Sequence, residues 1–164
     1  MLGGGFTLIE VILVVLIIGI AAGVVVPMMS SAGSMQIRAS VNMIAADLEY
    51  AKSMAISRGQ PYSVVFDKTA EGYQVVDQSN NPIPHPVKKG SYYVVNFQND
   101  CRLDQVNIAN ANFDGTSKVT FDYLGSPYNG SGSPLNSGVI TLQSGSVTRT
   151  VSVEPVTGFI SVSN

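Results

Sequence analysis

The sequence is poor in the residues that build disulfide bonds, metal centres and catalytic sites. Its 164 residues include one cysteine, one histidine and no tryptophan, and only 12% are charged. A single cysteine, Cys101, excludes an intrachain disulfide bond. Catalysis needs a nucleophile with a base, paired carboxylates or a metal cluster, and none of these stands out. We therefore predict no enzymatic activity, no catalytic or metal site and no cofactor.

The isolated polar residues have ordinary interpretations. His85 stands between two prolines, as expected of a solvated loop histidine. Cys101 follows an aspartate, which does not favour a thiolate, so we expect a structural or semi-buried thiol. The aspartates that could suggest a calcium site are Asp100, Asp104, Asp114 and Asp122. Their spacing matches no known oxygen-ligand loop.

Basic residues are also scarce. The formal net charge is −2 and the isoelectric point is about 5.2, so no basic stripe for nucleic acid is expected. The C-terminal segment 148–164 contains Arg149 alone and includes Glu154, while Lys88, Lys89 and Arg102 are scattered. This distribution disfavours DNA as a partner.

The strongest feature of the chain is a long apolar run near its start. No lysine or arginine precedes this run. Every residue from Val11 to Val26 is apolar or glycine. Counted over residues 6–29, a helix would be about 36 Å long, enough to cross a hydrocarbon core of about 30 Å. A secretory signal peptide would need a charged start and a shorter apolar core. A plain membrane anchor leaves Glu10 unexplained, because a central glutamate is disfavoured by about 2.5–3.5 kcal/mol.

The segment Gly5-Phe6-Thr7-Leu8-Ile9-Glu10 resembles the cleavage and methylation motif of type IV pilins and the related pseudopilins. The resemblance implies that a prepilin peptidase cuts after Gly5 and N-methylates Phe6. Glu10 would then be the fifth residue of the mature chain, where it would accept the charge of a neighbouring subunit's amine during assembly. Gly19 and Pro27 lie where many members of the family have helix-weakening residues.

A one-sided apolar stripe follows the first apolar run. Its members are Ile37, Val41, Ile44, Leu48, Ala51 and Ala55, at spacings of three and four residues. This pattern predicts that the helix continues as an amphipathic helix packed on a core. Gly59 followed by Pro61 predicts its end, and Pro27 predicts a kink or local loosening.

The rest of the chain has the alternating patterns and turn residues of β-strands. We predict strands at 62–66, 73–76, 92–97, 102–108, 118–124, 139–142, 147–154 and 159–163. A long Gly/Ser/Pro loop is expected at 125–138, and a hairpin is expected around Ser144-Gly145. The predicted fold class is α+β, with one long N-terminal helix packed on an antiparallel β-sheet head.

The second half of the chain is similar to the GspH/FimT family of minor pseudopilins and minor pilins, in "MIAADLEYAKSMAISRGQPYSVVF", "VTFDYLGSP", "GVITL" and "TRTVSVEPVTG". The resemblance implies a lollipop-shaped pilin. It would comprise a leader (1–5), a transmembrane and filament-core helix (6–29), an amphipathic continuation (30–59) and a β-rich periplasmic head (60–164).

The implied protein is a single-pass inner-membrane subunit that joins a type II secretion pseudopilus or a type IV pilus. Its partners would be prepilin peptidase, other pilin or pseudopilin subunits and the inner membrane. The alternative is a DNA-binding minor pilin of the FimT type, which acts in natural transformation.

Overall fold

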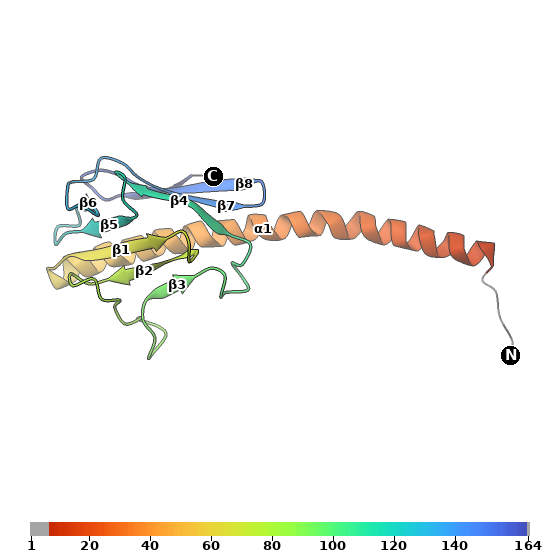
Figure 1. Ribbon diagram of the computed structural model, residues 1–164, viewed down its shortest axis with the longest axis horizontal. Helices are drawn as coiled ribbons and strands as arrows, with labels where there is room; N and C mark the ends of the chain where they lie inside the picture. Colours follow the sequence, from red (N-terminus) through yellow and green to blue (C-terminus); the bar gives the residue numbers. More distant parts are fainter. Residues whose placement is uncertain (1–6, 164) are drawn as a thin grey trace.

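The computed structural model describes residues 7–163, and within residues 23–32 it describes the backbone but not the side chains. The expected leader and its cut site, Gly5 and Phe6, lie outside this range. In the described range one helix, α1 (Leu8–Arg58), precedes all strands (Figure 1). The strands are β1 (Tyr62–Asp67), β2 (Gly72–Val76), β3 (Val94–Asn96), β4 (Asn107–Phe113), β5 (Lys118–Phe121), β6 (Pro127–Asn129), β7 (Gly138–Ser144), β8 (Val147–Val153) and β9 (Ile160–Ser163).

Helix α1 begins and ends at residues that suit helix caps. At its start, Thr7 is extended (φ −81°, ψ 151°) and its side chain accepts a hydrogen bond from the Glu10 amide. At its end, Gly59 adopts the left-handed conformation (φ +64°), which glycine tolerates best. The predicted end of the helix is therefore confirmed. The backbone is helical through Gly19 and Pro27, so their weakening effect stays a prediction.

The C-terminal part of α1 forms the centre of the head. All six residues of the predicted stripe, from Ile37 to Ala55, are at most 1% exposed. They pack in one hydrophobic core with buried side chains of the strands and of their connections, including Phe97, Phe113 and Phe121. The prediction that this stripe faces a core is confirmed. The N-terminal part of α1 projects from the head as a long, gently curved rod (Figure 1).

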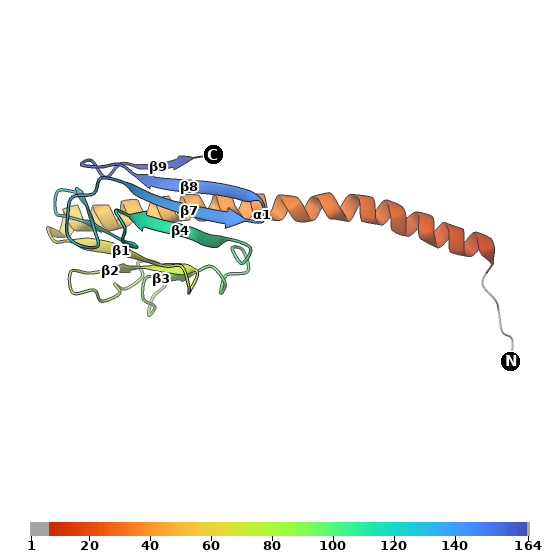
Figure 2. The same ribbon diagram turned by 45° about the horizontal axis from the view of Figure 1, so that its top comes forward.

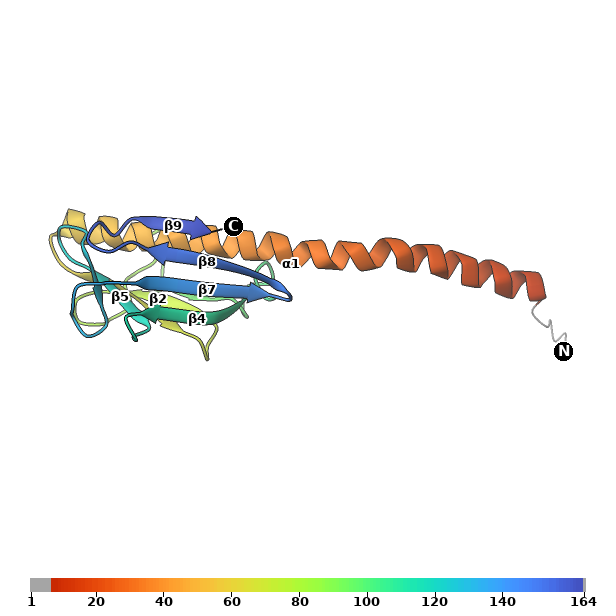
Figure 3. The same ribbon diagram turned by 90° about the horizontal axis from the view of Figure 1, so that it is seen from above.

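The strands form two antiparallel sheets on the helix. One has the order β3-β2-β1-β5-β6 and the other the order β4-β7-β8-β9. The four-stranded sheet lies along the head part of α1 (Figure 2), and α1 contacts β7, β8, β9 and β1. Viewed from above, β8 and β9 run beside the helix (Figure 3). The predicted α+β class is confirmed, with the strands divided between two sheets.

Two of the predicted chain segments are wrong. The strand expected at 102–108 is a series of turns up to Val106, because hydrogen bonds link residues three apart: Leu103 to Asp100 and Val106 to Leu103. The loop expected at 125–138 contains β6, whose backbone pairs with β5. The expected hairpin is confirmed, with β7 and β8 joined through Gly145 and Ser146.

Candidate assembly surface

The projecting part of α1 exposes an apolar surface. Every residue from Thr7 to Ala22 is exposed. The large apolar side chains are Leu8, Ile9, Val11, Ile12, Leu13, Val14, Val15, Leu16, Ile17, Ile18 and Ile20, and each is 47–78% exposed. Contiguous apolar patches of this kind on a protein mark surfaces that another protein or a membrane covers.

Glu10 lies in the first turn of the helix and is held there by its backbone. The Glu10 amide donates to the Thr7 carbonyl at 3.1 Å and to the Thr7 hydroxyl at 3.3 Å. A carboxylate in the first turn also interacts favourably with the positive end of the helix dipole. Thr7 is not among the residues predicted from the sequence. The signal that could have found it is Thr7-x-x-Glu10, a capping-box pattern.

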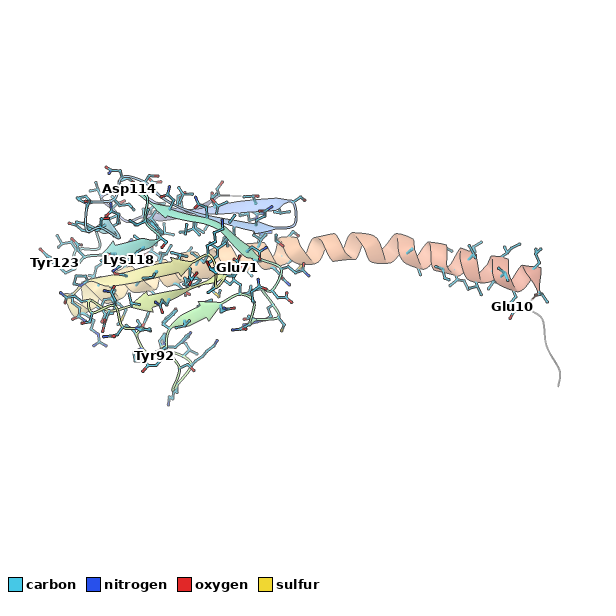
Figure 4. All side chains as sticks on the ribbon, viewed as in Figure 1. Glu10, Glu71, Tyr92, Asp114, Lys118 and Tyr123 are labelled. Carbon is cyan, nitrogen blue, oxygen red and sulfur yellow. The ribbon has the colours of Figure 1, made fainter. Side chains whose placement is uncertain are left out.

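The Glu10 side chain borders a shallow, largely apolar groove on the projecting helix. Glu10, Val11, Val14 and Val15 line this groove of about 300 Å³. These positions share one helix face, because residues four apart are neighbours on a helix. The carboxylate makes no hydrogen bond or ion pair with any described residue. The groove therefore presents one anionic group on apolar walls, near the N-terminal end of the projecting helix, where Figure 4 labels Glu10.

A cation for Glu10 is not supplied by the rest of the helix. The first lysine or arginine of the sequence is Arg38, 28 residues further along. At a rise of about 1.5 Å per residue, 28 residues correspond to about 42 Å along the helix axis. An attraction across that distance is negligible in any medium that contains salt. No lysine or arginine within residues 7–163 is therefore near enough to pair with Glu10. A cation that pairs with it must come from the chain's own N-terminus or from another molecule.

A test of helix length and hydropathy on the part of the chain that the structure describes finds no helix able to cross a membrane.

The structure does not test the roles predicted for Gly5, Phe6, Gly19 and Pro27. Gly5 and Phe6 lie outside the described residues. A methyl group placed at Gly19 would meet no atom within 4 Å, so packing within this chain does not require glycine there. Pro27 is described only by its helical backbone.

A second polar site lies where the head meets the helix. Asp47 of α1 accepts hydrogen bonds from two tyrosine hydroxyls, Tyr73 at 2.6 Å and Tyr93 at 2.8 Å. The Tyr93 ring also stacks on Tyr50 of α1, with ring centroids 5.4 Å apart. These contacts fasten β2 and the segment that leads into β3 to the helix. Their character is structural, since each carboxylate oxygen has a fixed donor.

The pKa values of this cluster follow from burial. Desolvation raises the pKa of Asp47 above its usual range, although the two tyrosine hydrogen bonds act in the opposite direction. Desolvation, and then the Asp47 charge and hydrogen bond, raise the pKa of Tyr73 well above its ordinary value. Tyr93 is affected in the same direction for the same reasons. The tyrosines thus stay protonated donors throughout the neutral range.

His85 and Cys101 are placed differently from our expectation. His85 is half-buried and stacks on Tyr93 with ring centroids 4.5 Å apart, so the expectation of a solvated loop histidine is wrong. Its Nδ1 accepts from the amides of Val87 and Lys88. Cys101 is exposed rather than semi-buried, because the turns around it direct Phe97 and Leu103 into the core instead.

The acidic residues are used separately to hold turns. The Asp100 carboxylate accepts from Nε and Nη2 of Arg102, a hydrogen-bonded pair that lowers the pKa of Asp100 to about 2. Asp104 accepts from Gln36, and Asp114 and Asp122 accept from backbone amides of nearby loops. Among the described residues, no three side chains of histidine, cysteine, aspartate or glutamate could hold a metal ion together.

The basic residues considered for DNA binding come from separate segments of the head. Arg149 belongs to β8 of the four-stranded sheet, where it is half-buried on the side that carries Val151 and Val153. Lys88 and Lys89 are exposed in the connection between β2 and β3 of the other sheet. Arg102 is engaged by Asp100. Lys88 and Arg102 do line one pocket, but the acidic Asp47 and Asp100 line it with them. Arg149 belongs to the other sheet, so the cations do not form the stripe that phosphate binding requires.

Comparisons with known proteins agree with this architecture. The profile of the family described as type II transport protein GspH matches residues 40–157. A comparison with curated protein sequences gives no match.

Solved structures similar to the chain include those of a minor pilin and of a minor pseudopilin. One is the type IV minor pilin FimU of Pseudomonas aeruginosa (strain PAO1), with 16% identity and a TM-score of 0.51 over 77% of this chain and 92% of the other. The other is the minor pseudopilin EpsH of the type 2 secretion system of Vibrio cholerae, with 9% identity and a TM-score of 0.54 over 77% and 94%. At these identities the likeness concerns the fold alone.

Proposed function

The chain belongs to the family of the type II transport protein GspH, and on that premise we propose that it is a minor pseudopilin or minor pilin. It acts as a structural subunit of a periplasmic type II secretion pseudopilus or of a type IV pilus. The family is one of structural pilin-like subunits rather than of enzymes. The subunit associates with other pilin or pseudopilin subunits through its N-terminal helix.

One observation carries this proposal: the projecting part of α1 exposes apolar side chains on all sides around a single carboxylate. Eleven large apolar residues between Leu8 and Ile20 are 47–78% exposed, whereas the stripe of the same helix inside the head is fully buried. A helix that is apolar all round is stable only when lipid or other helices surround it. A membrane would surround the projecting helix with lipid first, and a filament core would then surround it with the helices of other subunits.

Glu10 would set how the N-terminal helices of neighbouring subunits are aligned along their axes. Cleavage after Gly5 would create an amine at Phe6, and a neighbouring subunit's amine is the cation that the groove of Glu10, Val11, Val14 and Val15 would receive. An unpaired charge in apolar surroundings is costly, and its pairing removes most of that cost. Subunits that place the two charges side by side are thus favoured over subunits that are shifted along the helix axis.

The same proposal covers processing and location. Prepilin peptidase would remove residues 1–5 and methylate Phe6, and the subunit would wait in the inner membrane with its head in the periplasm. The length of the apolar run in the sequence supports the membrane stage, since residues 6–29 as a helix would span about 36 Å. Entry into the filament would follow.

The test is the replacement Glu10→Gln in the full chain, expressed in its own host. Removal of one partner from a buried ion pair costs about 3–5 kcal/mol. We therefore expect the fraction of the subunit recovered in sheared filaments, or cross-linked to other subunits, to fall more than tenfold. Mass spectrometry of the N-terminus reports processing separately, and processing should persist in this variant.

The matched control is Glu49→Gln, which makes the same chemical change at an exposed position of the same helix. The Glu49 carboxylate forms an exposed ion pair with Lys52 at 3.4 Å, and its replacement should leave assembly unchanged. Incorporation of Glu10→Gln at the level of the unaltered protein would contradict the proposed role of Glu10. An N-terminus that is not Phe6 in the unaltered protein would contradict the processing.

A further inference from the structure

The sequence contains a single asparagine that is followed by glycine, Asn129, and it is the last residue of β6. In a flexible chain an asparagine–glycine pair reacts with itself, because glycine has no side chain to keep its amide nitrogen away from the neighbouring carboxamide. The glycine nitrogen attacks Cγ of the asparagine, ammonia leaves and a succinimide ring forms. Water then opens the ring to aspartate or isoaspartate. Asn129 thus has the most reactive neighbour of any asparagine in this chain.

The fold makes use of both residues of this pair. Asn129 is 7% exposed, and its Oδ1 accepts hydrogen bonds from the amides of Ser131 and Ser133, each at 3.0 Å. These bonds shape the turn that follows β6. A methyl group placed at Gly130 would lie 3.0 Å from Oγ1 of Thr116, so a larger residue would be crowded there. The turn therefore favours asparagine followed by glycine, although that pair is chemically labile.

Hydrogen bonds hold the reacting groups in an unreactive arrangement. The Gly130 amide donates to Oγ1 of Thr116 at 2.9 Å. Attack on Cγ of Asn129 requires the Gly130 nitrogen to lose its hydrogen and to turn toward the carboxamide, and both changes break that bond. Thr116 is fixed in turn, because its hydroxyl donates to the Phe113 carbonyl at 2.9 Å. The pair is thus protected for as long as Thr116 accepts from Gly130.

Strand β6 has the features of a segment that opens easily. It is three residues long and is the last strand of the five-stranded sheet, where it pairs with β5. The residues that follow it, 130–134, are all exposed. Short edge segments of this kind separate locally while the rest of a domain stays folded. Separation of β6 from β5 removes Thr116 from Gly130 and admits water to the pair.

We propose that Asn129 is a gated modification site: it stays asparagine while β6 is paired with β5, and it is converted to aspartate or isoaspartate when β6 opens. Thr116 is the positioning residue that keeps the site closed. The proposal does not depend on which assembly the subunit joins.

The conversion needs water as its one co-reactant. The Gly130 nitrogen forms a bond to Cγ of Asn129, and the carboxamide nitrogen leaves as ammonia with the proton that the glycine amide gives up. Water then adds across one of the two carbon–nitrogen bonds of the ring, and no oxidation or reduction takes place. Isoaspartate places an extra carbon in the main chain, which disturbs the pairing of β6 with β5. A head that has opened is therefore altered irreversibly.

The experiment compares variants of the full chain, incubated in detergent at mildly alkaline pH. Thr116→Val removes the acceptor of the Gly130 amide, and Thr116→Ser retains it. Thr120→Val is the matched control, because it makes the same change on β5, where the hydroxyl pairs with Ser63 at 2.9 Å. Mass spectrometry of the peptide that contains Asn129 measures aspartate and isoaspartate. Hydrogen exchange of the Gly130 amide measures opening, and the unaltered chain in urea gives the rate of the unprotected pair.

Loss of a hydrogen bond of this kind should raise the population of opened β6 about tenfold. We therefore expect Thr116→Val to increase exchange at Gly130 and conversion at Asn129 together, by about tenfold. Thr116→Ser and Thr120→Val should convert at about the rate of the unaltered folded chain, which should be far below the rate in urea.

Equal conversion in Thr116→Val and Thr120→Val would overturn the role of Thr116. Conversion of the folded unaltered chain as fast as in urea would overturn the gate, and this comparison holds even where Thr116→Val fails to fold. Exchange at Gly130 that rises without conversion at Asn129 would overturn the modification site itself.

Discussion

The head part and the projecting part of helix α1 are both rich in apolar residues, but those residues have different surroundings. Between Ile37 and Ala55 the apolar residues lie on one face and are at most 1% exposed, because the sheets of the head cover them. Between Leu8 and Ile20 apolar residues lie on every face and all are exposed. The head part thus completes its packing within the chain, and the projecting part leaves its packing to other molecules.

The carboxylates of the two parts show the same contrast. Asp47 receives a tyrosine hydroxyl on each oxygen. Glu10 has no side-chain partner within residues 7–163 and stands beside valines. The comparison teaches that a polar group on an apolar helix face is structural when the fold supplies its donors, and is a signal for association when it does not.

The strongest way to test this contrast is to remove a leucine from each part. Leu48→Ala should lower the free energy of unfolding of the full chain in detergent by about 2–5 kcal/mol, since it leaves a cavity in a closed core. Leu13→Ala should change it by less than about 0.5 kcal/mol, because that side chain packs on nothing in the head. Denaturant titration followed by tyrosine fluorescence measures both. Equal losses would refute the division of the helix into two parts.

The next effect concerns the carboxylates. Asp47→Ala should cost about 2–4 kcal/mol of folding free energy, because two buried tyrosine hydroxyls lose a charged acceptor. Glu10→Ala should leave the stability of the head unchanged and act on assembly alone. The same titration compares the two variants. A destabilised head in Glu10→Ala would show that Glu10 has a structural partner after all.

The two tyrosines also predict how stability changes at alkaline pH. Their pKa values are higher in the folded protein than the ordinary value of about 10, so the unfolded chain releases these protons first. Their contribution is complete below pH 10 and is lost as the pH rises through the folded-state values. Thermal unfolding between pH 8 and 11 should show this decline, and it should be smaller in a Tyr73→Phe, Tyr93→Phe double variant. A decline of equal size in both proteins would contradict the assignment.

The smallest predicted effect is an increase in stability. Val156→Gly should raise the free energy of unfolding by about 1 kcal/mol, since glycine adopts positive φ without the steric cost that valine bears. Val87→Gly should instead be neutral or slightly destabilising, because Val87 has no positive φ and glycine adds freedom to the unfolded chain. Thermal midpoints of the two variants compare them directly. A loss of stability in Val156→Gly would mean that the positive φ of Val156 carries no steric cost.

The sequence predicted correctly those features that depend on residues close together in the chain. The stripe from Ile37 to Ala55, the helix end at Gly59 and the β7–β8 hairpin depend on residues a few positions apart, and all three are confirmed. The strand expected at 102–108 was wrong because hydrogen bonds between residues three apart hold this segment in successive turns up to Val106. Only Asn107 and Ile108 of the expected strand belong to β4.

Long-range contacts were not visible in the sequence. Strand β6 is three residues within a Gly/Ser/Pro-rich segment, and it exists because β5 is available to pair with it. Asp47 meets Tyr73 and Tyr93 across 26 and 46 residues, and His85 is drawn out of solvent by the Tyr93 ring. No local pattern encodes these encounters, because they depend on how the sheets pack on the helix.

The sequence by itself determined the long helix with its two apolar patterns, the isolated Glu10 and the resemblance of residues 5–10 to a pilin cleavage motif. Periodicity and capping act over one or two helical turns, so the chain carries that information locally. Only the tertiary structure decided which carboxylate found partners and how the strands divide into two sheets. Burial and hydrogen bonding depend on the distances between segments, and folding alone fixes those distances.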